Sequence, residues 1–344
     1  MSRERLWDSS SVFAIAEIGL NHGGSPERAL AMVDAAAAAG ASAIKLQSIV
    51  ADRLVAETSC APAHVDAVSL RAFFGRFELD WDAHRAVVTR AHDLGLAVLT
   101  TPFAVETVPV LDALGFDAFK IASGDLTFDG LIAAVAATRR PLVLSTGMSD
   151  LGEVHHAVRV ARDAGARRIA LLHCVSAYPT PVPDENLRAI GTLARAFGVP
   201  VGLSDHGRGL PSAIAAVALG ASVYERHFVL EGDETAIDRP VSSTPAEFAA
   251  IVAAMADTRA ALGDGVKTCR PSERPNLRPS RRGLYATRTL QPGEVVTADD
   301  VAVLRPASSY GPADVSLLLG ATVRRTVGAG EAFVDLHVTM GSAA

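Results

Sequence analysis

The sequence predicts a (β/α)8 barrel over residues 1–262, followed by a small β-rich domain over residues 283–344. Three observations lead to this prediction. Between residues 12 and 262, short runs rich in β-branched residues alternate with Ala-rich stretches of helical length, a pattern typical of repeated β/α units around a parallel sheet. Eight such units can be counted, and about 250 residues is the usual length of a (β/α)8 barrel. Residues 263–282 are rich in Pro, Gly and Arg and lack apolar periodicity, which is typical of an interdomain linker.

Each predicted strand is a short apolar run that ends at polar residues. An open doubly wound sheet is the alternative, but that fold more often carries a GxGxxG phosphate fingerprint after its first strand. This chain has GLNHGGS at that place, residues 19–25. We therefore favour the closed barrel, with strands at 12–19, 41–47, 96–102, 117–123, 141–147, 168–174, 200–206 and 222–228.

Two further segments stand out from this pattern. Residues 48–80 are too many for an ordinary β/α loop and include the apolar run FFGRF, so we expect an insertion over one end of the barrel. In the C-terminal domain, residues 288–301 and 325–338 match at Arg, Thr, Gly, Glu and the final Val. We interpret them as two similar half-units, each turning at a Gly-Glu pair.

Composition excludes several classes of function. The net charge of −6 provides no excess of cations for nucleic acid or an anionic membrane. The first ten residues are too charged to begin a secretory signal, and no apolar run reaches the ~18 residues of a membrane span. Cys60, Cys174 and Cys269 fit neither a disulfide framework nor a Cys-based zinc motif. We expect a cytoplasmic protein that binds small molecules.

Polar residues lie at the carboxyl ends of nearly all the predicted strands, where (β/α)8 barrels have their active sites. The lysines are the most informative, because the chain has only three and an unpaired ammonium is costly to bury. Lys45 and Lys120 lie inside apolar strands and are predicted to be functional, whereas Lys267 lies in the linker and is expected to be a solvated cation. The other candidates are Glu17, Asn21, His22, Gln47, Ser123, Ser145, Thr146, His173, Ser176, Tyr178, Ser204, Asp205, His206, Glu225, Arg226, His227 and Asp238.

Two histidines end consecutive strands. Neighbouring strands lie about 4.8 Å apart, so His206 and His227 could reach one divalent ion. No third protein ligand is evident, and a two-His site would leave positions open for water and substrate. A structural hydrogen-bonding role is the alternative for each.

Lysines and hydroxyl groups on three consecutive strands predict an anion site, most simply for a phosphate. These residues would form one continuous wall. Strict alternation places Lys120 and Ser123 on opposite faces, so the strand must end or bend between them. The wall comprises Lys120, Ser123, Ser145, Ser176 and Tyr178.

Ten motifs in one order resemble the sialic acid synthases, the family that includes N-acetylneuraminate, pseudaminic acid and legionaminic acid synthases. The resemblance spans nearly the whole chain. It lies in AEIGLNHGGS (16–25), IKLQ (44–47), TTPF (100–103), KIASGD (120–125), LSTGM (144–148), LLHCVSAYPTP (171–181), VGLSDH (201–206), ERHF (225–228), RRGLYA (281–286) and LRP (304–306).

The resemblance implies a TIM barrel followed by an antifreeze-like (SAF) domain. It also implies a domain-swapped homodimer, in which the SAF domain of each chain caps the barrel of the other. The implied reaction condenses phosphoenolpyruvate with an N-acylated aldose, using Mn²⁺ or Mg²⁺.

The resemblance also implies a role for individual residues. His206 and His227 would hold the metal, and Glu17, Asp238 and Arg305 would face the aldose, with Arg305 supplied by the SAF domain. Glu17, Lys45, Lys120 and Asp238 would be catalytic. Phosphoenolpyruvate would bind to Lys45, Gln47, Lys120, Ser123, Ser145, Ser176 and Tyr178.

The departures from the family pattern lie mainly where the sugar is expected. Asp125 stands where a Glu is frequent, Ala236-Ile237 precedes Asp238 where Gly-Pro is usual, and Ala307 follows LRP where Gly is common. The acceptor therefore stays open between N-acetylmannosamine, a diacetamido-trideoxyhexose and an unusual sugar aldehyde of a specialised pathway. Two other classes also stay open: a Schiff-base pyruvate lyase with Lys120 as nucleophile, and a non-catalytic sugar-phosphate binder.

Overall fold

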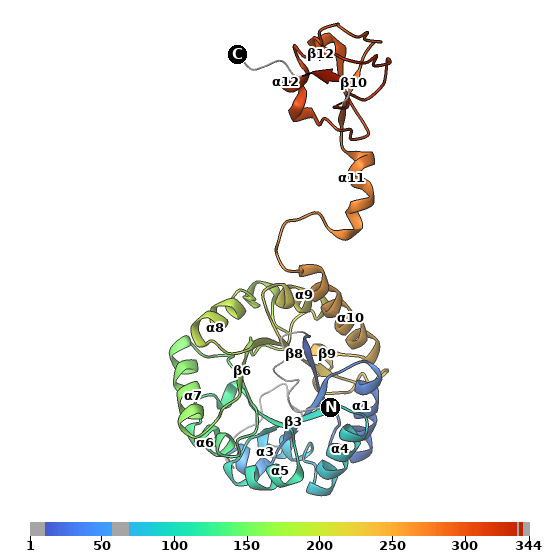
Figure 1. Cartoon of the computed structure of the whole chain (residues 1–344). Coiled ribbons are helices and arrows are strands. Elements are labelled where there is room, and N and C mark those ends of the chain that lie inside the picture. Colours follow the sequence, from blue (N-terminus) through green and yellow to red (C-terminus); the bar gives the residue numbers. More distant parts are fainter. Residues whose placement is uncertain (1–10, 57–68, 336, 340–344) are drawn as a thin grey trace. The chain divides into compact units, whose positions relative to one another are not determined.

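A computed structural model describes residues 11–56, 69–335 and 337–339. Its contacts divide the chain into two units, Met1–Gly263 and Asp264–Ala344. In the first unit, eight parallel strands pair in sequence order, and β1 also pairs with β8, so the sheet closes into the predicted (β/α)8 barrel (Figure 1). The strands are β1 Phe13–Glu17, β2 Ala43–Ser48, β3 Ala97–Pro102, β4 Ala118–Ile121, β5 Leu142–Ser145, β6 Ile169–Cys174, β7 Val201–Asp205 and β8 Val223–Phe228. A two-residue strand that was not predicted, β9 Ser242–Ser243, extends the sheet beside β8.

Helices surround the sheet (Figure 1). Two of them begin with a capping box, in which two side chains accept the free backbone N–H groups of the first turn. Asp150 and Glu153 form it at the start of α7, and Thr244 and Glu247 form it at the start of α10. The α-helices are α1 Pro26–Ala38, α2 Ala51–Leu54, α3 Leu70–Gly75, α4 Trp81–Asp93, α5 Val108–Leu114, α6 Asp129–Ala137, α7 Leu151–Asp163, α8 Ala189–Phe197, α9 Leu210–Ala218 and α10 Pro245–Leu262. Short 3-10 helices are η2 Val105–Thr107, η3 Ser123–Asp125, η4 Val182–Asp184 and η5 Arg239–Val241.

The barrel has two separate apolar cores, because alternate residues of each strand point to opposite faces of the sheet. The outer core fills the space between the sheet and the helices. The inner core closes the barrel interior, as expected for this fold. Its buried members are Phe13, Ile15, Ala43, Leu99, Ala118, Val143, Leu172 and Val223.

The described parts of the predicted insertion, residues 48–56 and 69–80, return to the loop between β1 and α1. Glu78 accepts the backbone N–H of Ala51 at 2.5 Å, and the carbonyl oxygen of Arg76 fills the space that a Cβ on Gly24 would need. Gly24 also has φ +78°, so this close approach requires glycine. The insertion therefore packs at the carboxyl end of the strands. Residues 57–68 lie outside the described residues.

The segment expected as an irregular linker, 263–282, contains a short helix that was not predicted. Pro271 and Pro275 occupy first-turn positions, which tolerate proline because their N–H groups have no partner within the helix. The elements are η6 Pro271–Glu273 and α11 Arg274–Ser280.

The remainder of the second unit is built of short strands and turns around its own core, which includes Leu284, Leu318 and Phe333. Two antiparallel pairs are present, β10 with β11 and β12 with β13. Its elements are β10 Gly283–Ala286, η7 Ala298–Asp300, β11 Val301–Leu304, η8 Pro312–Asp314, α12 Val315–Leu318, β12 Thr322–Val323 and β13 Val338–Thr339.

The two half-units inferred from the sequence turn in the same way. Gly293 and Gly330 both have positive φ, at +93° and +79°. Glu294 accepts the N–H of Gln291 at 2.5 Å, and Glu331 accepts that of Gly328 at 2.7 Å. Each Gly-Glu pair therefore closes one turn. An antiparallel bridge, Leu290 with Val327, joins the two half-units.

Within the part of the chain that the structure describes, no helix is both long and apolar enough to cross a membrane.

Candidate active site

A cavity of about 260 Å³ opens at the carboxyl ends of the barrel strands. Of the residues to which the resemblance gives a role, all except Asp238 and Arg305 line it: Glu17, Lys45, Gln47, Lys120, Ser123, Ser145, Ser176, Tyr178, His206 and His227. The other candidates Asn21, His22, Thr146, His173, Asp205 and Arg226 do not line it. The cavity is also lined by Thr101, Phe103, Ala122, Gly124, Met148, Cys174, Ser204 and Glu225.

The two lysines meet a buried carboxylate that sequence reasoning had placed on a strand end without giving it a role. Lys120 Nζ donates to Glu225 Oε1 at 2.9 Å, and Lys45 Nζ lies 3.8 Å from Glu225 Oε2. Ser204 also donates to Glu225 Oε1, at 2.8 Å. Glu225 is only 4% exposed, so it compensates both ammonium groups away from water.

Lys45 has two further partners. Its Nζ forms an ion pair with Glu17, and it donates to Thr101 Oγ1 at 3.2 Å. Burial lowers the pKa of Lys45, but the charges of Glu17 and Glu225 outweigh that effect and raise it. For Lys120, burial and the nearby charge of Lys45 outweigh the effect of Glu225, so its pKa is lowered.

The role of Glu225 could have been predicted from the alternation of side chains along β8. His227 points into the cavity, and a residue two positions earlier on the same strand must share that face. Glu225 is that residue, and the register sets it beside Ser204 of β7.

The three predicted serines lie around the start of the loop after β5. Ser123 Oγ accepts the N–H of Gly147 at 3.0 Å, and a Cβ on Gly147 would lie 2.5 Å from Ser176 Oγ. β4 ends at Ile121 and Ser123 begins η3, so the strand ends where the predicted wall required it to. Ser145 Oγ is buried and has no hydrogen-bond partner among the described residues. A buried hydroxyl of this kind is available to a ligand.

The two histidine rings lie side by side, with centroids 5.4 Å apart. His206 Nδ1 lies 3.2 Å from the carbonyl oxygen of Val175, and His227 Nδ1 lies 3.1 Å from Asp238 Oδ2. The first contact is a hydrogen bond and the second an ion pair, and both involve Nδ1. Neither Nε2 has a protein partner among the described residues, so both remain free to act as ligands.

Burial and the charge of His227 lower the pKa of His206 to about 3, so this ring is neutral at physiological pH, as a metal ligand must be. Burial lowers the pKa of His227 as well, but the carboxylate of Asp238 outweighs that effect and raises it. Among the described residues, no group of three or more His, Cys, Asp or Glu side chains is arranged to hold a metal ion. Two imidazoles alone would leave the other coordination positions of an ion to water and substrate.

Two predicted site residues lie elsewhere. Asp238, expected to face the sugar, contacts His227, and its backbone N–H donates to Asn21 Oδ1 at 2.9 Å. Asn21 also donates to the carbonyl oxygen of Phe228 at 2.8 Å, so it fixes the Asp238 loop to the end of β8. Arg305 is exposed directly after β11 in the second unit, and it stays a prediction.

Comparisons with known proteins identify relatives of both units. The model of the NeuB family matches residues 32–267, and that of the SAF domain matches residues 281–338. An N,N'-diacetyllegionaminic acid synthase of Campylobacter jejuni is 35% identical, over 89% of this chain and 94% of that protein. A pseudaminic acid synthase of the same species is 32% identical, over 94% of this chain and 96% of that protein.

A solved structure resembles much of this chain. It is an N-acetylneuraminic acid (sialic acid) synthetase of Leptospira borgpetersenii in complex with citrate, 33% identical with a TM-score of 0.71. The match covers 78% of this chain and 90% of that one.

Proposed function

Because the chain belongs to the NeuB family of sialic acid synthases and ends in a SAF domain, we propose that it condenses phosphoenolpyruvate with an N-acylated aldose. The products are a sialic-type nonulosonic acid and inorganic phosphate. The chain is a synthase of this family, and the acceptor is the part that we infer. We take it to be N-acetylmannosamine or a diacetamido-trideoxyhexose, since the named relatives make legionaminic and pseudaminic acids.

The observation that carries the proposal is the charge arrangement of the cavity. Its lining holds two carboxylates, Glu17 and Glu225, and two ammonium groups, Lys45 and Lys120, whose formal charges cancel. A trianionic substrate would gain little from such a lining alone. A divalent cation on His206 and His227 would make the cavity positive, which favours binding of phosphoenolpyruvate.

We propose Mn²⁺ or Mg²⁺ as this ion. The imidazoles of His206 and His227 would hold it through Nε2, with Asp238 fixing the orientation of the second ring. When bound, it would polarise the aldehyde oxygen of the acceptor.

The protein's own groups position the other substrate. Lys45 and Lys120 bind the carboxylate and phosphate of phosphoenolpyruvate, and Ser123, Ser145 and Ser176 donate their hydroxyls to its oxygens. Its methylene carbon then attacks the aldehyde carbon and forms the carbon–carbon bond. Water adds to the carbon that carries the phosphate, and cleavage of the carbon–oxygen bond releases phosphate.

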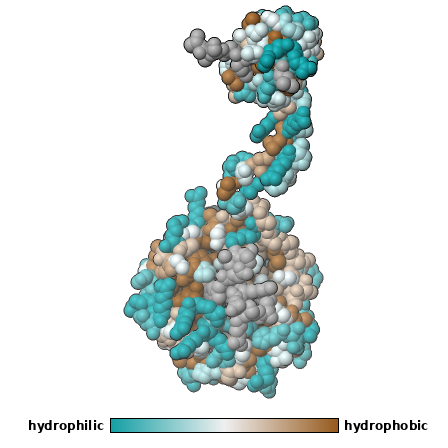
Figure 2. All heavy atoms as spheres, viewed as in Figure 1, coloured by the Kyte–Doolittle hydropathy of each residue, from teal (hydrophilic) through white to brown (hydrophobic). Residues whose placement is uncertain are grey.

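We also propose that a second copy of the chain caps the barrel with its SAF domain. Large apolar side chains are exposed in the segments that follow β4 to β8, although exposed apolar surface is costly unless covered. Arg305 follows Leu304, which is itself 49% exposed, so this end of β11 has the character of a contact surface. In these segments the exposed residues are Phe128, Met148, Leu151, Tyr178, Val182, Leu210 and Ile237, and elsewhere on the barrel Leu94, Ile214, Leu219 and Leu262 are exposed as well. On the face of the barrel shown in Figure 2, hydrophobic residues gather at the upper left, and hydrophilic ones lie mainly along the left and lower rim.

Mixed dimers test the cap. An Arg305→Ala chain mixed with a Lys120→Ala chain regains activity if the cap acts across subunits, because some dimers then hold one intact site. No recovery would mean that each SAF domain caps the barrel of its own chain.

We place the reaction in the cytoplasm, where phosphoenolpyruvate is a metabolite.

The reaction itself is tested by phosphate release from phosphoenolpyruvate and Mn²⁺ across a panel of aldoses, with EDTA as the control. The panel includes N-acetylmannosamine and the diacetamido-trideoxyhexoses. The proposal predicts a metal-dependent product heavier than one aldose by one pyruvic acid. Absence of any product, together with absence of phosphoenolpyruvate binding, would reject it.

The lowered pKa of Lys120 favours one other candidate, a Schiff-base pyruvate lyase, because a lysine nucleophile must lose its proton. The bond from its Nζ to Glu225 instead favours an ammonium that binds anions. Borohydride reduction in the presence of pyruvate separates the two. We expect no mass increase at Lys120, and a stable adduct there would support the lyase.

A further inference from the structure

The outer face of β7 and β8, directly behind the two histidines, holds a second group of buried polar side chains. Residues on these strands alternate, so Asp205 and Arg226 turn away from the cavity that their neighbours line. The register pairs Asp205 with Arg226. The two residues are only 3% and 6% exposed, so both charges are compensated within the protein.

The contacts of this pair concentrate on the backbone around His206. Arg226 Nη1 lies 3.2 Å from Asp205 Oδ2 and donates to the carbonyl oxygens of Asp205 and Gly207, at 3.4 and 3.3 Å. Asp205 Oδ1 accepts the N–H of Gly207 at 2.7 Å. The chain is therefore held on both sides of His206, in the segment where β7 has ended and regular strand pairing no longer fixes it.

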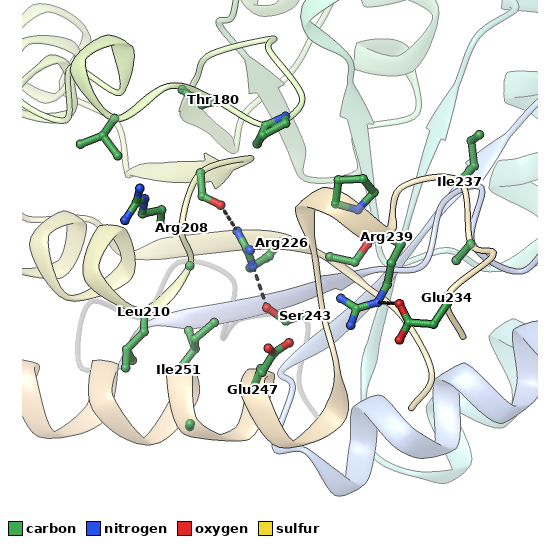
Figure 3. A pocket seen from close by; sticks show the side chains of 18 of the residues that line it. Thr180, Arg208, Leu210, Arg226, Glu234, Ile237, Arg239, Ser243, Glu247 and Ile251 are labelled. Atoms are coloured by element: carbon green, nitrogen blue, oxygen red, sulfur yellow. Dashed lines mark hydrogen bonds and ion pairs between the residues drawn. The ribbon is translucent and has the colours of Figure 1, made fainter. Parts of the chain in front are cut away.

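The same guanidinium reaches β9, the strand beside the other histidine. Arg226 Nε donates to Ser243 Oγ at 2.7 Å (Figure 3). Ser243 lies on β9, which pairs with β8 at His227. Tyr224 Oη donates to Asp205 Oδ2 at 2.6 Å and fixes the carboxylate from β8. One side chain thus connects the segment of His206 to the strands beside His227.

The backbone of the loop after β7 approaches the guanidinium closely on one side. A Cβ on Gly209, which has φ +73°, would lie 3.2 Å from Arg226 Cζ. The guanidinium also forms part of the wall of a larger pocket outside the barrel, between the loop after β7 and α10 (Figure 3).

We propose that Arg226 and Asp205 form a positioning pair that sets the distance between the His206 and His227 imidazoles and thereby the affinity for the divalent ion. The inference rests on the proposed metal site. Neither residue touches the ion or a substrate. Partners that orient metal ligands typically change metal affinity by about 10–100-fold when they are lost.

Arg226→Lys is the main test, because it keeps the positive charge beside Asp205 but cannot make the forked contacts to both carbonyls. The full-length chain is titrated with Mn²⁺ alone, and free Mn²⁺ is followed by electron paramagnetic resonance. We expect Kd to rise about tenfold or more, with the melting temperature recorded on the same samples. Asp205→Asn with Arg226→Gln removes both charges together, so that no unpaired ion is left buried if the lysine variant fails to fold.

The chain offers a matched control at the other end of the barrel. Arg140 donates to Asp112 Oδ1 at 2.7 Å and to the carbonyl oxygens of Phe116 and Asp112, so it has the same kinds of partner far from the histidines. Arg140→Lys, and Asp112→Asn with Arg140→Gln, are expected to leave the Mn²⁺ affinity unchanged.

Three results would overturn the inference, and only the last of them would also reject the proposed metal site. Unchanged Mn²⁺ affinity in both Arg226 variants would reject the positioning role and leave the metal site intact. An equal loss in the Arg140 variants would show that any broken ion pair has this effect. Absence of Mn²⁺ binding in the unmodified chain, with no difference from His206→Ala, would reject the proposed metal site itself.

Discussion

The inner face of the barrel changes character within two residues on several strands. On β1, β2, β4 and β8, an apolar residue of the inner core is followed two positions later by a charged one that lines the cavity. The pairs are Ile15 and Glu17, Ala43 and Lys45, Ala118 and Lys120, and Val223 and Glu225. The same strands therefore provide two layers. We call the apolar inner-core residues the floor and the charged residues that line the cavity the upper layer.

The difference shows how the two layers depend on each other. The apolar floor excludes water from below, so the charges above it interact in a medium of low dielectric constant. Each ammonium in that layer consequently has a carboxylate partner, as in the pairs Lys45 with Glu17 and Lys120 with Glu225. Changes in the floor should affect stability, and changes in the upper layer should affect chemistry.

The largest effect is expected from the two histidines that we propose as metal ligands, both in the upper layer. His206→Ala and His227→Ala should each reduce phosphate release by about a thousandfold or more, roughly 4 kcal/mol of transition-state stabilisation. The melting temperature should change little. His156→Ala, which removes a half-exposed imidazole beside Asp129, is the control and should retain full activity. Full activity in either ligand variant would exclude a role for that histidine in metal binding.

A substitution in the floor should show the opposite pattern. Leu99 is fully buried in the inner core, so Leu99→Ala should lower the free energy of unfolding by about 2–5 kcal/mol. Denaturant unfolding measures this loss. For the protein that remains folded, kcat/KM should stay within about threefold of the unmodified value. A specific loss of catalysis without loss of stability would mean that the two layers are not separable.

Glu225→Gln breaks the compensation within the upper layer. The amide keeps its size but not its charge, so both lysines lose their shared partner and their positions relax. We expect kcat/KM to fall about a hundredfold, or roughly 2.7 kcal/mol. Ser204→Ala removes only one hydrogen bond to the same carboxylate and should cost less. Equal losses in the two variants would argue against charge compensation as the role of Glu225.

The smallest effect is expected from replacing Asp125, a carboxyl group near the cavity whose pKa is shifted mainly by burial. Burial raises its pKa from 3.8 to about 6. The folded state therefore binds this proton more tightly than the unfolded state, and the resulting stability is present below pH 3.8 and lost as pH rises through about 6. Asp125→Asn should remove that dependence and leave the variant more stable above pH 6, by roughly 1–3 °C in melting temperature. Parallel pH profiles of the two proteins would contradict it.

Much of this architecture could be predicted from the sequence, because strand periodicity records which face each residue occupies. That principle placed Lys45 and Gln47 on one face, whereas the closed barrel was predicted from the number of β/α units. It also contained the signal for Glu225, two residues before His227. The contact of Asp238 with His227 could not be predicted, since it depends on how Asn21, more than 200 residues away in the sequence, fixes the loop after β8.

Two other elements, β9 and α11, could not be predicted from sequence periodicity or propensity. β9 has only two residues, too few to show a period, and it is defined by its pairing with β8. α11 contains two prolines, so helix propensity argued against it. Only one of these prolines, Pro275, lies in the first turn where proline is tolerated, and Pro279 lies inside the helix.

The central claim is that the cavity lining is charge-balanced and needs the divalent ion to bind phosphoenolpyruvate. Calorimetric titration of phosphoenolpyruvate into the full-length chain, once with Mn²⁺ and once with EDTA, tests it directly. We predict binding at least about tenfold tighter with Mn²⁺, a difference of about 1.4 kcal/mol that disappears in His206→Ala. Equal affinity in Mn²⁺ and in EDTA would contradict the claim.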